Sequence, residues 1–144
     1  IYKVGNYLDF KVTVYDDREE FVGKERFPEA IELKSGDYVN NINQYEFDPY
    51  TYTAIVTRGH LQDAECLRAV LSKPGKYVGL IGSKRKIRLV MDDLAKDGYG
   101  AEDFARLHAP IGLDIGAETP EEIAIAIMAE IIEEKNGKES SKNS

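Results

Sequence analysis

Residues 77–85 read Tyr77-Val78-Gly79-Leu80-Ile81-Gly82-Ser83-Lys84-Arg85, a short apolar strand followed by a glycine turn and the start of a helix. Two earlier stretches have the same form. Lys11-Val12-Thr13-Val14-Tyr15 stops at Asp16-Asp17-Arg18, and Thr53-Ala54-Ile55-Val56-Thr57 stops at Arg58-Gly59-His60. A weaker fourth candidate is Ile31-Glu32-Leu33. Short apolar strands that each end in a polar or glycine turn predict a parallel sheet whose carboxyl ends line a common crevice.

Three amphipathic or apolar stretches predict helices between and after these strands. Residues 61–72 carry apolar side chains at helical spacing before the breaker Pro74-Gly75. Residues 83–96 also carry apolar side chains at helical spacing, with Ser83 as the N-cap and Gly98 as the residue that ends the helix. Thr119-Pro120-Glu121-Glu122 has the residues of a capping box and begins a third helix. The alternation favours an α/β fold with a Rossmann-like, doubly wound and mainly parallel sheet.

The third predicted helix and the residues after it differ sharply in composition. Residues 122–134 are apolar almost all round, so we expect this helix to be covered on more than one side, by the domain or by a partner. Residues 135–144 are polar and are expected to be a disordered tail. The predicted domain therefore covers residues 1–134.

Composition narrows the classes of function. The chain has 144 residues, enough for one domain, and no apolar run long enough to span a membrane. A formal net charge of -7 disfavours a nucleic-acid binder. One cysteine, Cys66, and two histidines make a structural zinc site improbable, and we predict no metal site. The single cysteine fits a reducing cytoplasm. Motifs of common hydrolases and nucleotide-hydrolysing enzymes are absent.

Asp16 ends the first strand, where a dinucleotide-binding fold places the acid that binds the ribose hydroxyls. That acid normally follows a glycine-rich fingerprint by about 20 residues. Fifteen residues precede Asp16, and no such fingerprint is among them. Two readings stay open: Asp16 and Asp17 cap a turn, or residues 1–10 end the first helix of a fold whose first strand and phosphate loop are missing.

Thr57, Gly59 and His60 follow a central strand, a position where loop residues often bind ligands. His60 is a candidate for ligand contact or proton transfer. Asp63 shares a helical face with Leu67 and Val70, an unusual place for a solvated carboxylate. It either stabilises the helix dipole or acts with His60.

Gly82, Ser83, Lys84 and Arg85 combine exposed amides at a helix start with cations, which suits an anion site. The alternative is that the cations form a solvated face.

The segment from His108 to Ala117 is apolar and contains Pro110, Gly112 and two isolated polar side chains, His108 and Asp114. Glycines allow such a loop to pack closely. We interpret it as a pocket wall that holds His108 and Asp114, the alternative being a rigid connector to the last helix.

Several of these motifs, in the same order, resemble the C-terminal Rossmann domain of the XdhC/CoxI family of xanthine dehydrogenase accessory proteins. The resemblance rests on residues 12–18, 26–30, 57–63, 77–86, 107–117 and 119–124, and it extends from Lys11 to Glu134. At position 58 this chain has Arg58 where the family often has histidine.

The resemblance implies a cytoplasmic, often homodimeric maturation factor, closer to a chaperone than to a catalyst. Such a protein binds molybdenum cofactor (molybdopterin), aids its sulfuration and delivers it to xanthine dehydrogenase or a related molybdenum hydroxylase, and a cysteine desulfurase is a further candidate partner. Accessory proteins of selenium-dependent hydroxylases share the domain, so the client enzyme stays open. The alternative function is an NAD(P)-binding oxidoreductase domain.

Overall fold

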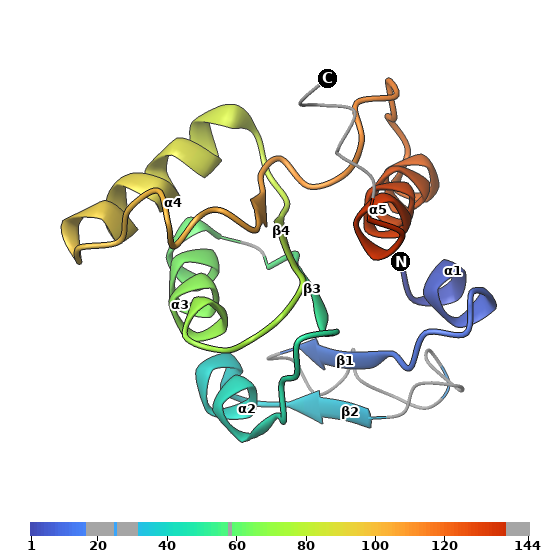
Figure 1. The fold of residues 1–144 in the computed structure, drawn as a ribbon, viewed down its shortest axis with the longest axis horizontal. Helices are drawn as coiled ribbons and strands as arrows, with labels where there is room; N and C mark the ends of the chain where they lie inside the picture. The colour runs from blue at the N-terminus through green and yellow to red at the C-terminus, as the bar shows by residue number, and fades with distance from the viewer. Residues whose placement is uncertain (17–24, 26–31, 58, 138–144) are drawn as a thin grey trace.

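The computed structural model describes residues 1–16, 25, 32–57 and 59–137, and of Glu32–Ser35 the backbone alone. From β2 onward, strands and helices alternate along these residues, and α1 and β1 precede them (Figure 1). The helices are α1 (Tyr2–Tyr7), α2 (Tyr38–Gln44), α3 (His60–Leu71), α4 (Lys84–Lys96) and α5 (Pro120–Lys135). The strands are β1 (Thr13–Asp16), β2 (Glu32–Ser35), β3 (Tyr52–Ile55), β4 (Tyr77–Leu80) and β5 (Leu107–His108).

All the strand pairings in the described part of the chain are parallel. β1 pairs with β2, and β4 lies between β3 and β5 in a separate sheet. A dinucleotide-binding sheet has the strand order 3-2-1-4-5-6. In that numbering, β2 and β1 correspond to strands 3 and 2, and β3, β4 and β5 correspond to strands 4, 5 and 6. Strand 1 of that order has its place between β1 and β3. The predicted Rossmann-like sheet without its first strand is confirmed.

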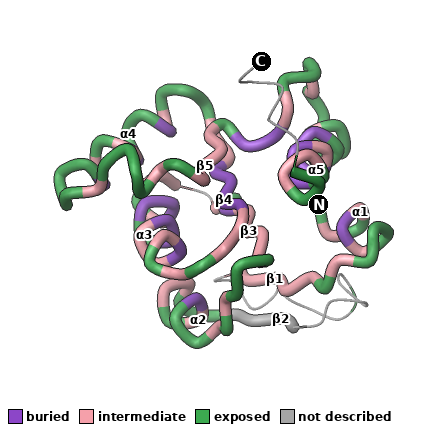
Figure 2. Tube along the Cα trace, viewed as in Figure 1, coloured by how far each residue is buried: buried purple, intermediate pink, exposed green. Residues whose placement is uncertain are grey.

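Helices cover both faces of the strands (Figure 1). On one face, α2, α3 and α4 bury a cluster that includes Ile42, Ile55, Leu67, Val70, Leu80, Val90 and Leu94. On the other, α1 and α5 cover a smaller cluster of Tyr77, Ile111, Ile127, Met128 and Ile131. The purple segments in Figure 2 therefore follow β4 and the inner sides of α3 and α5. β4 is buried along its whole length, as a strand covered on both faces must be.

The predicted helix ends agree closely with the structure. The Ser83 hydroxyl accepts a hydrogen bond from the Lys86 amide, and Gly98 follows α4 with a φ of 93°. Thr119 and Glu122 form the complete capping box. α5 runs on to Lys135, and residues 138–144 of the expected tail lie outside the described residues.

Helix α5 is buried on one side, where it carries Ala126, Ile127, Met128, Glu130 and Ile131. Ile125 and Ile132 are exposed at 51% and 38%. The domain thus covers one face of this apolar helix and leaves another open to solvent.

Two elements were missed from the sequence. α2 is short and polar, although Asp37 caps it by accepting a bond from the Asn40 amide. β5 has only two residues, and it is a strand because Val78 and Gly79 of β4 pair with it. No periodic pattern is detectable over so few residues.

Arg106 ties the end of α3 to the start of β5. Its guanidinium donates hydrogen bonds to the backbone carbonyls of Val70, Leu71, Lys73 and Gly75. The last carbonyls of a helix have no partner within the helix, so this side chain satisfies them. Its partial burial lowers the pKa of Arg106.

We expect Arg106→Met to lower the free energy of unfolding by about 2 kcal/mol, because several part-buried carbonyls lose a charged donor. Urea denaturation measures the change. Arg68→Met is the matched control: Arg68 pairs with Asp97 at 2.8 Å in an exposed position, and its loss should cost about 0.5 kcal/mol or less. Equal losses in the two variants would contradict a capping role for Arg106.

Candidate functional site

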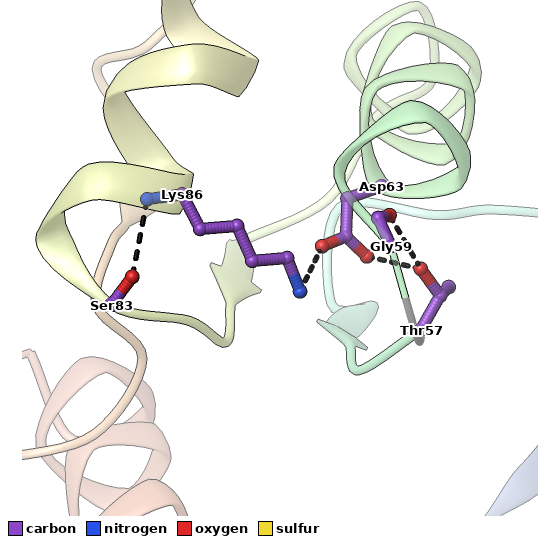
Figure 3. Close-up of polar contacts among 5 residues, drawn as sticks. All are labelled: Thr57, Gly59, Asp63, Ser83 and Lys86. Carbon is purple, nitrogen blue, oxygen red and sulfur yellow. Dashed lines mark hydrogen bonds and ion pairs between the residues drawn. The ribbon is translucent and has the colours of Figure 1, made fainter.

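The carboxyl ends of β3 and β4 hold a polar cluster in which Asp63 is central (Figure 3). Thr57 follows β3, and its hydroxyl donates to Asp63 Oδ1 and lies 3.3 Å from the Gly59 carbonyl oxygen. Asp63 lies in the first turn of α3 and is fully buried, at 0% exposure. A buried carboxylate needs charged and hydrogen-bonding partners, which Thr57 only partly supplies.

The remaining charge of Asp63 is balanced by Lys86 of α4. The Lys86 ammonium lies 2.6 Å from Asp63 Oδ2, and its side chain is 24% exposed. Figure 3 shows the lysine stem reaching across from one helix to the other. This ion pair joins the first turns of α3 and α4 and holds their N-termini at the same edge of the sheet.

The start of α3 leaves room for a ligand, whereas the turn before α4 is packed against Lys86. Gly59 is the N-cap of α3, and a Cβ there would meet nothing within 4 Å. Gly82 precedes α4 with a φ of 145°, and a Cβ there would come within 2.9 Å of the Lys86 side chain. Lys84 and Arg85 are exposed beside this turn. Two helix N-termini and two exposed cations make the edge suitable for an anion.

A second polar cluster lies on the opposite face of β4, under α5. Glu130 is fully buried and accepts hydrogen bonds from the Tyr77 hydroxyl at 2.7 Å and the Gly112 amide at 2.9 Å. The His108 ring stacks on Tyr77, with centroids 4.6 Å apart, and its Nδ1 lies 3.5 Å from Glu130 Oε2. Burial and the Glu130 carboxylate raise the pKa of Tyr77, so its hydroxyl stays a donor at physiological pH.

This second cluster fixes the loop after β5. Gly112 has a φ of 95°, and a Cβ there would lie 3.2 Å from the Ile127 amide nitrogen, so close packing against α5 requires glycine. Pro110 follows a cis peptide bond and is exposed, as is Asp114. The loop is buried at Ile111 and Gly112 only.

The predicted site residues therefore divide into two groups. The first group follows β3 and β4 at one edge of the sheet, at the starts of α3 and α4: Thr57, Gly59, His60, Asp63, Gly82, Ser83, Lys84 and Arg85. Gly112 and His108 belong to the cluster under α5, and Asp114 is exposed. Asp63 contacts Thr57 and Lys86, and not His60. Asp16 ends β1 and lines a cavity of about 550 Å³ between β1 and β3, and Asp17 lies outside the described residues.

Three important residues were not predicted as site residues. Lys86 follows Lys84 and Arg85 in a run of cations, but it lies four residues before the buried Val90 and so shares its face. Glu130 interrupts an otherwise apolar run, which is a sequence signal for a buried carboxylate. Tyr77 has no such signal, because its partners come from segments distant in sequence.

Two further kinds of feature bear on function, metal sites and membrane-spanning helices. In the residues that the structure describes, no group of three or more His, Cys, Asp or Glu side chains could hold a metal ion. Within the same residues, none of the helices combines the length and apolarity needed to cross a membrane.

The comparison with protein families agrees with this geometry. A family model described as the XdhC Rossmann domain matches residues 1–131. The chain belongs to the XdhC Rossmann-domain family. The resemblance read from the sequence motifs is thereby confirmed.

Relatives of this XdhC Rossmann domain are longer proteins. It is 37% identical over 130 residues to the uncharacterized protein YqeB of Escherichia coli (strain K12), covering 90% of the chain and 24% of that protein. It is 29% identical over 124 residues to a Bacillus subtilis (strain 168) protein described as a probable xanthine dehydrogenase subunit, covering 86% and 36%. The chain thus spans about a quarter to a third of these relatives.

One solved structure supports the fold independently. A crystal structure described as that of a xanthine dehydrogenase from Bacillus halodurans matches with a TM-score of 0.81 and 28% identity, over 99% of this chain and 40% of that one.

Proposed function

We propose that this domain binds molybdenum cofactor through its phosphate group at the starts of α3 and α4. In this role it serves the maturation of xanthine dehydrogenase or a related molybdenum hydroxylase. The observation that carries the proposal is the buried Asp63–Lys86 pair, which holds two helix N-termini at one sheet edge. The relative described as a probable xanthine dehydrogenase component gives the biological setting.

The residues at the starts of α3 and α4 fit the phosphate group of the molybdenum cofactor. The open space at Gly59 lets a phosphate approach the first amides of α3. Lys84 and Arg85 stand at the start of α4 and add positive charge. Lys86 is committed to Asp63, so its part is to position the two helices rather than to contact the phosphate.

His60 is a further polar side chain at the start of α3. It is the first residue of α3 and follows the open Gly59 directly. In this proposal its imidazole donates a hydrogen bond to the bound cofactor and orients it. The redox chemistry of the cofactor belongs to the enzyme that receives it.

Sulfuration is assigned to a partner in this proposal. Cys66 is only 4% exposed and belongs to the hydrophobic core, away from the start of α3. A buried thiol of this kind is a poor nucleophile. A cysteine desulfurase would therefore supply the sulfur while this domain holds the cofactor.

The proposal predicts that the protein binds molybdopterin and that Lys84→Ala combined with Arg85→Ala weakens binding about tenfold, which corresponds to about 1.4 kcal/mol. His60→Ala should weaken it by a similar factor. Calorimetry or cofactor absorbance measures the affinity. Because exposed charges carry the attraction, affinity should also fall as salt is raised.

Arg88→Ala provides the matched control. Arg88 is an exposed cation on the same helix, one turn after Lys84. Its removal therefore tests the effect of one positive charge lost away from the helix start. We expect it to leave the affinity almost unchanged. If Arg88→Ala weakens binding as much as the double variant does, the helix start is not the phosphate site.

A dinucleotide is the second candidate ligand, because Asp16 ends β1 where such folds bind the ribose hydroxyls. A carboxylate there disfavours the 2′-phosphate of NADPH. This alternative predicts that NADH, followed by its fluorescence, binds about tenfold more tightly than NADPH, and that Asp16→Ala removes the difference. Equal affinities for the two would exclude the ribose role of Asp16.

A further inference from the structure

Helices α4 and α5 both end on an acid or amide side chain that is followed by glycine. Asp97 is the C-cap of α4 and precedes Gly98, and Asn136 is the C-cap of α5 and precedes Gly137. No other aspartate or asparagine of the chain precedes glycine. The backbone nitrogen of a following residue can attack the side-chain carbon of such a group, and glycine has no Cβ to hinder it. These two pairs are therefore where this attack is least hindered.

The backbone is almost the same at the two helix ends. Asp97 has a φ of -93° and a ψ of 9°, and Asn136 has a φ of -91° and a ψ of 6°. Each glycine has a positive φ, and its amide donates to the carbonyl three residues earlier, at 3.1 Å for Gly98 and 3.2 Å for Gly137. Backbone geometry thus does not distinguish the two pairs.

The side chains at the two helix ends are held differently. The Arg68 guanidinium of α3 donates to Asp97 Oδ2 at 2.8 Å, which ties the end of α4 to the neighbouring helix. Asn136 and Gly137 are both exposed. Within the part of the chain that the structure describes, no comparable side-chain contact holds Asn136. The end of α5 is therefore the freer of the two.

Freedom at the end of α5 decides whether the attack can occur. The Gly137 nitrogen must leave its hydrogen bond to the Glu134 carbonyl and turn toward Asn136 Cγ. Exposed helix ends fray, so this opening is accessible without unfolding the domain. At the end of α4 the same movement has to break the ion pair between Arg68 and Asp97.

We propose that Asn136 is a site of spontaneous deamidation. The Gly137 nitrogen gives its proton to a base from solvent and bonds to Asn136 Cγ, the bond from Cγ to Nδ2 breaks, and ammonia leaves. Water then opens the succinimide ring and gives aspartate or isoaspartate at position 136. The product adds a negative charge where the dipole of α5 is already negative. This modification is independent of the ligand proposed for the starts of α3 and α4.

The experiment follows the whole protein during incubation at neutral and at mildly alkaline pH. Cleavage after glutamate releases residues 135–139, in which mass spectrometry detects the change from amide to acid. Methylation by an isoaspartate methyltransferase measures the isoaspartate. We expect conversion at Asn136 that is faster at alkaline pH, because the attacking nitrogen must lose its proton. Gly137→Ala should slow it about tenfold, since a Cβ hinders the attack.

Asp97 is the internal control, because loss of water from its carboxyl group gives the same ring. Aspartate reacts more slowly than asparagine, so the decisive comparison is between the wild type and Arg68→Met. That variant releases Asp97 and should raise isoaspartate at position 97 while leaving position 136 unchanged.

Two results would overturn the proposal. One is an unchanged Asn136 after a time in which a free peptide of residues 133–139 converts. The other is conversion in Gly137→Ala at the rate of the wild type. If Arg68→Met left position 97 as unreactive as before, the argument that side-chain anchoring selects Asn136 would fail as well.

Discussion

Replacing Glu130 with alanine is expected to lower the free energy of unfolding by about 4 kcal/mol, because two buried donors lose their acceptor and a cavity remains. The donors are the Tyr77 hydroxyl and the Gly112 amide, which both bind Glu130 Oε1. Neither can turn to solvent, since Tyr77 is 0% exposed and Gly112 is packed against α5. Chemical denaturation followed by circular dichroism measures the change.

Glu134→Ala is the matched control on the same helix. Its carboxylate lies 3.4 Å from His108 Nε2, but its side chain is 26% exposed, so water can replace the contact. We expect a loss of about 1 kcal/mol or less. If Glu130→Ala cost no more than Glu134→Ala, the buried cluster would not be what holds the loop after β5 against α5.

The sequence predicted the elements whose signals are local. Apolar runs located β1, β3 and β4, and capping residues located the starts of α4 and α5. Ser83 and Thr119 could be assigned because an N-cap acts within three residues of itself. The family followed from several such motifs in the right order.

The pairing of polar side chains could not be predicted in the same way. Asp63 was recognised as unusual, because a carboxylate shared the face of Leu67 and Val70. Its partner Lys86 lies 23 residues further on, in a run of four residues with three cations; the helical face that it shares with Val90 points to burial but does not identify Asp63 as its partner. Only the packing of α3 against α4 selects it.

The loop from His108 to Ala117 shows the same limit. Its apolar character predicted burial, which holds only at Ile111 and Gly112. It also led to the prediction that His108 and Asp114 share a pocket wall, which stays a prediction; Asp114 is exposed in the structure. His108 instead contacts Glu130 and Glu134, which belong to α5.

Lys86→Met is expected to lower the free energy of unfolding by about 3 kcal/mol, because it leaves the Asp63 carboxylate buried without its counter-charge. Methionine keeps most of the apolar stem, so packing against Gly82 changes little. The loss should therefore reflect charge rather than volume. Urea denaturation at neutral pH gives the value.

The double variant Asp63→Asn with Lys86→Met separates charge from shape. If the unpaired carboxylate causes the loss, removing its charge should restore most of the stability, since a buried ion pair can often be replaced by neutral groups at little cost. Asparagine still offers an oxygen to the Thr57 hydroxyl, which keeps the other contact of position 63. A double variant no more stable than Lys86→Met alone would mean that the lysine acts through its stem. The link between the first turns of α3 and α4 would then be one of packing, with no need for the ion pair.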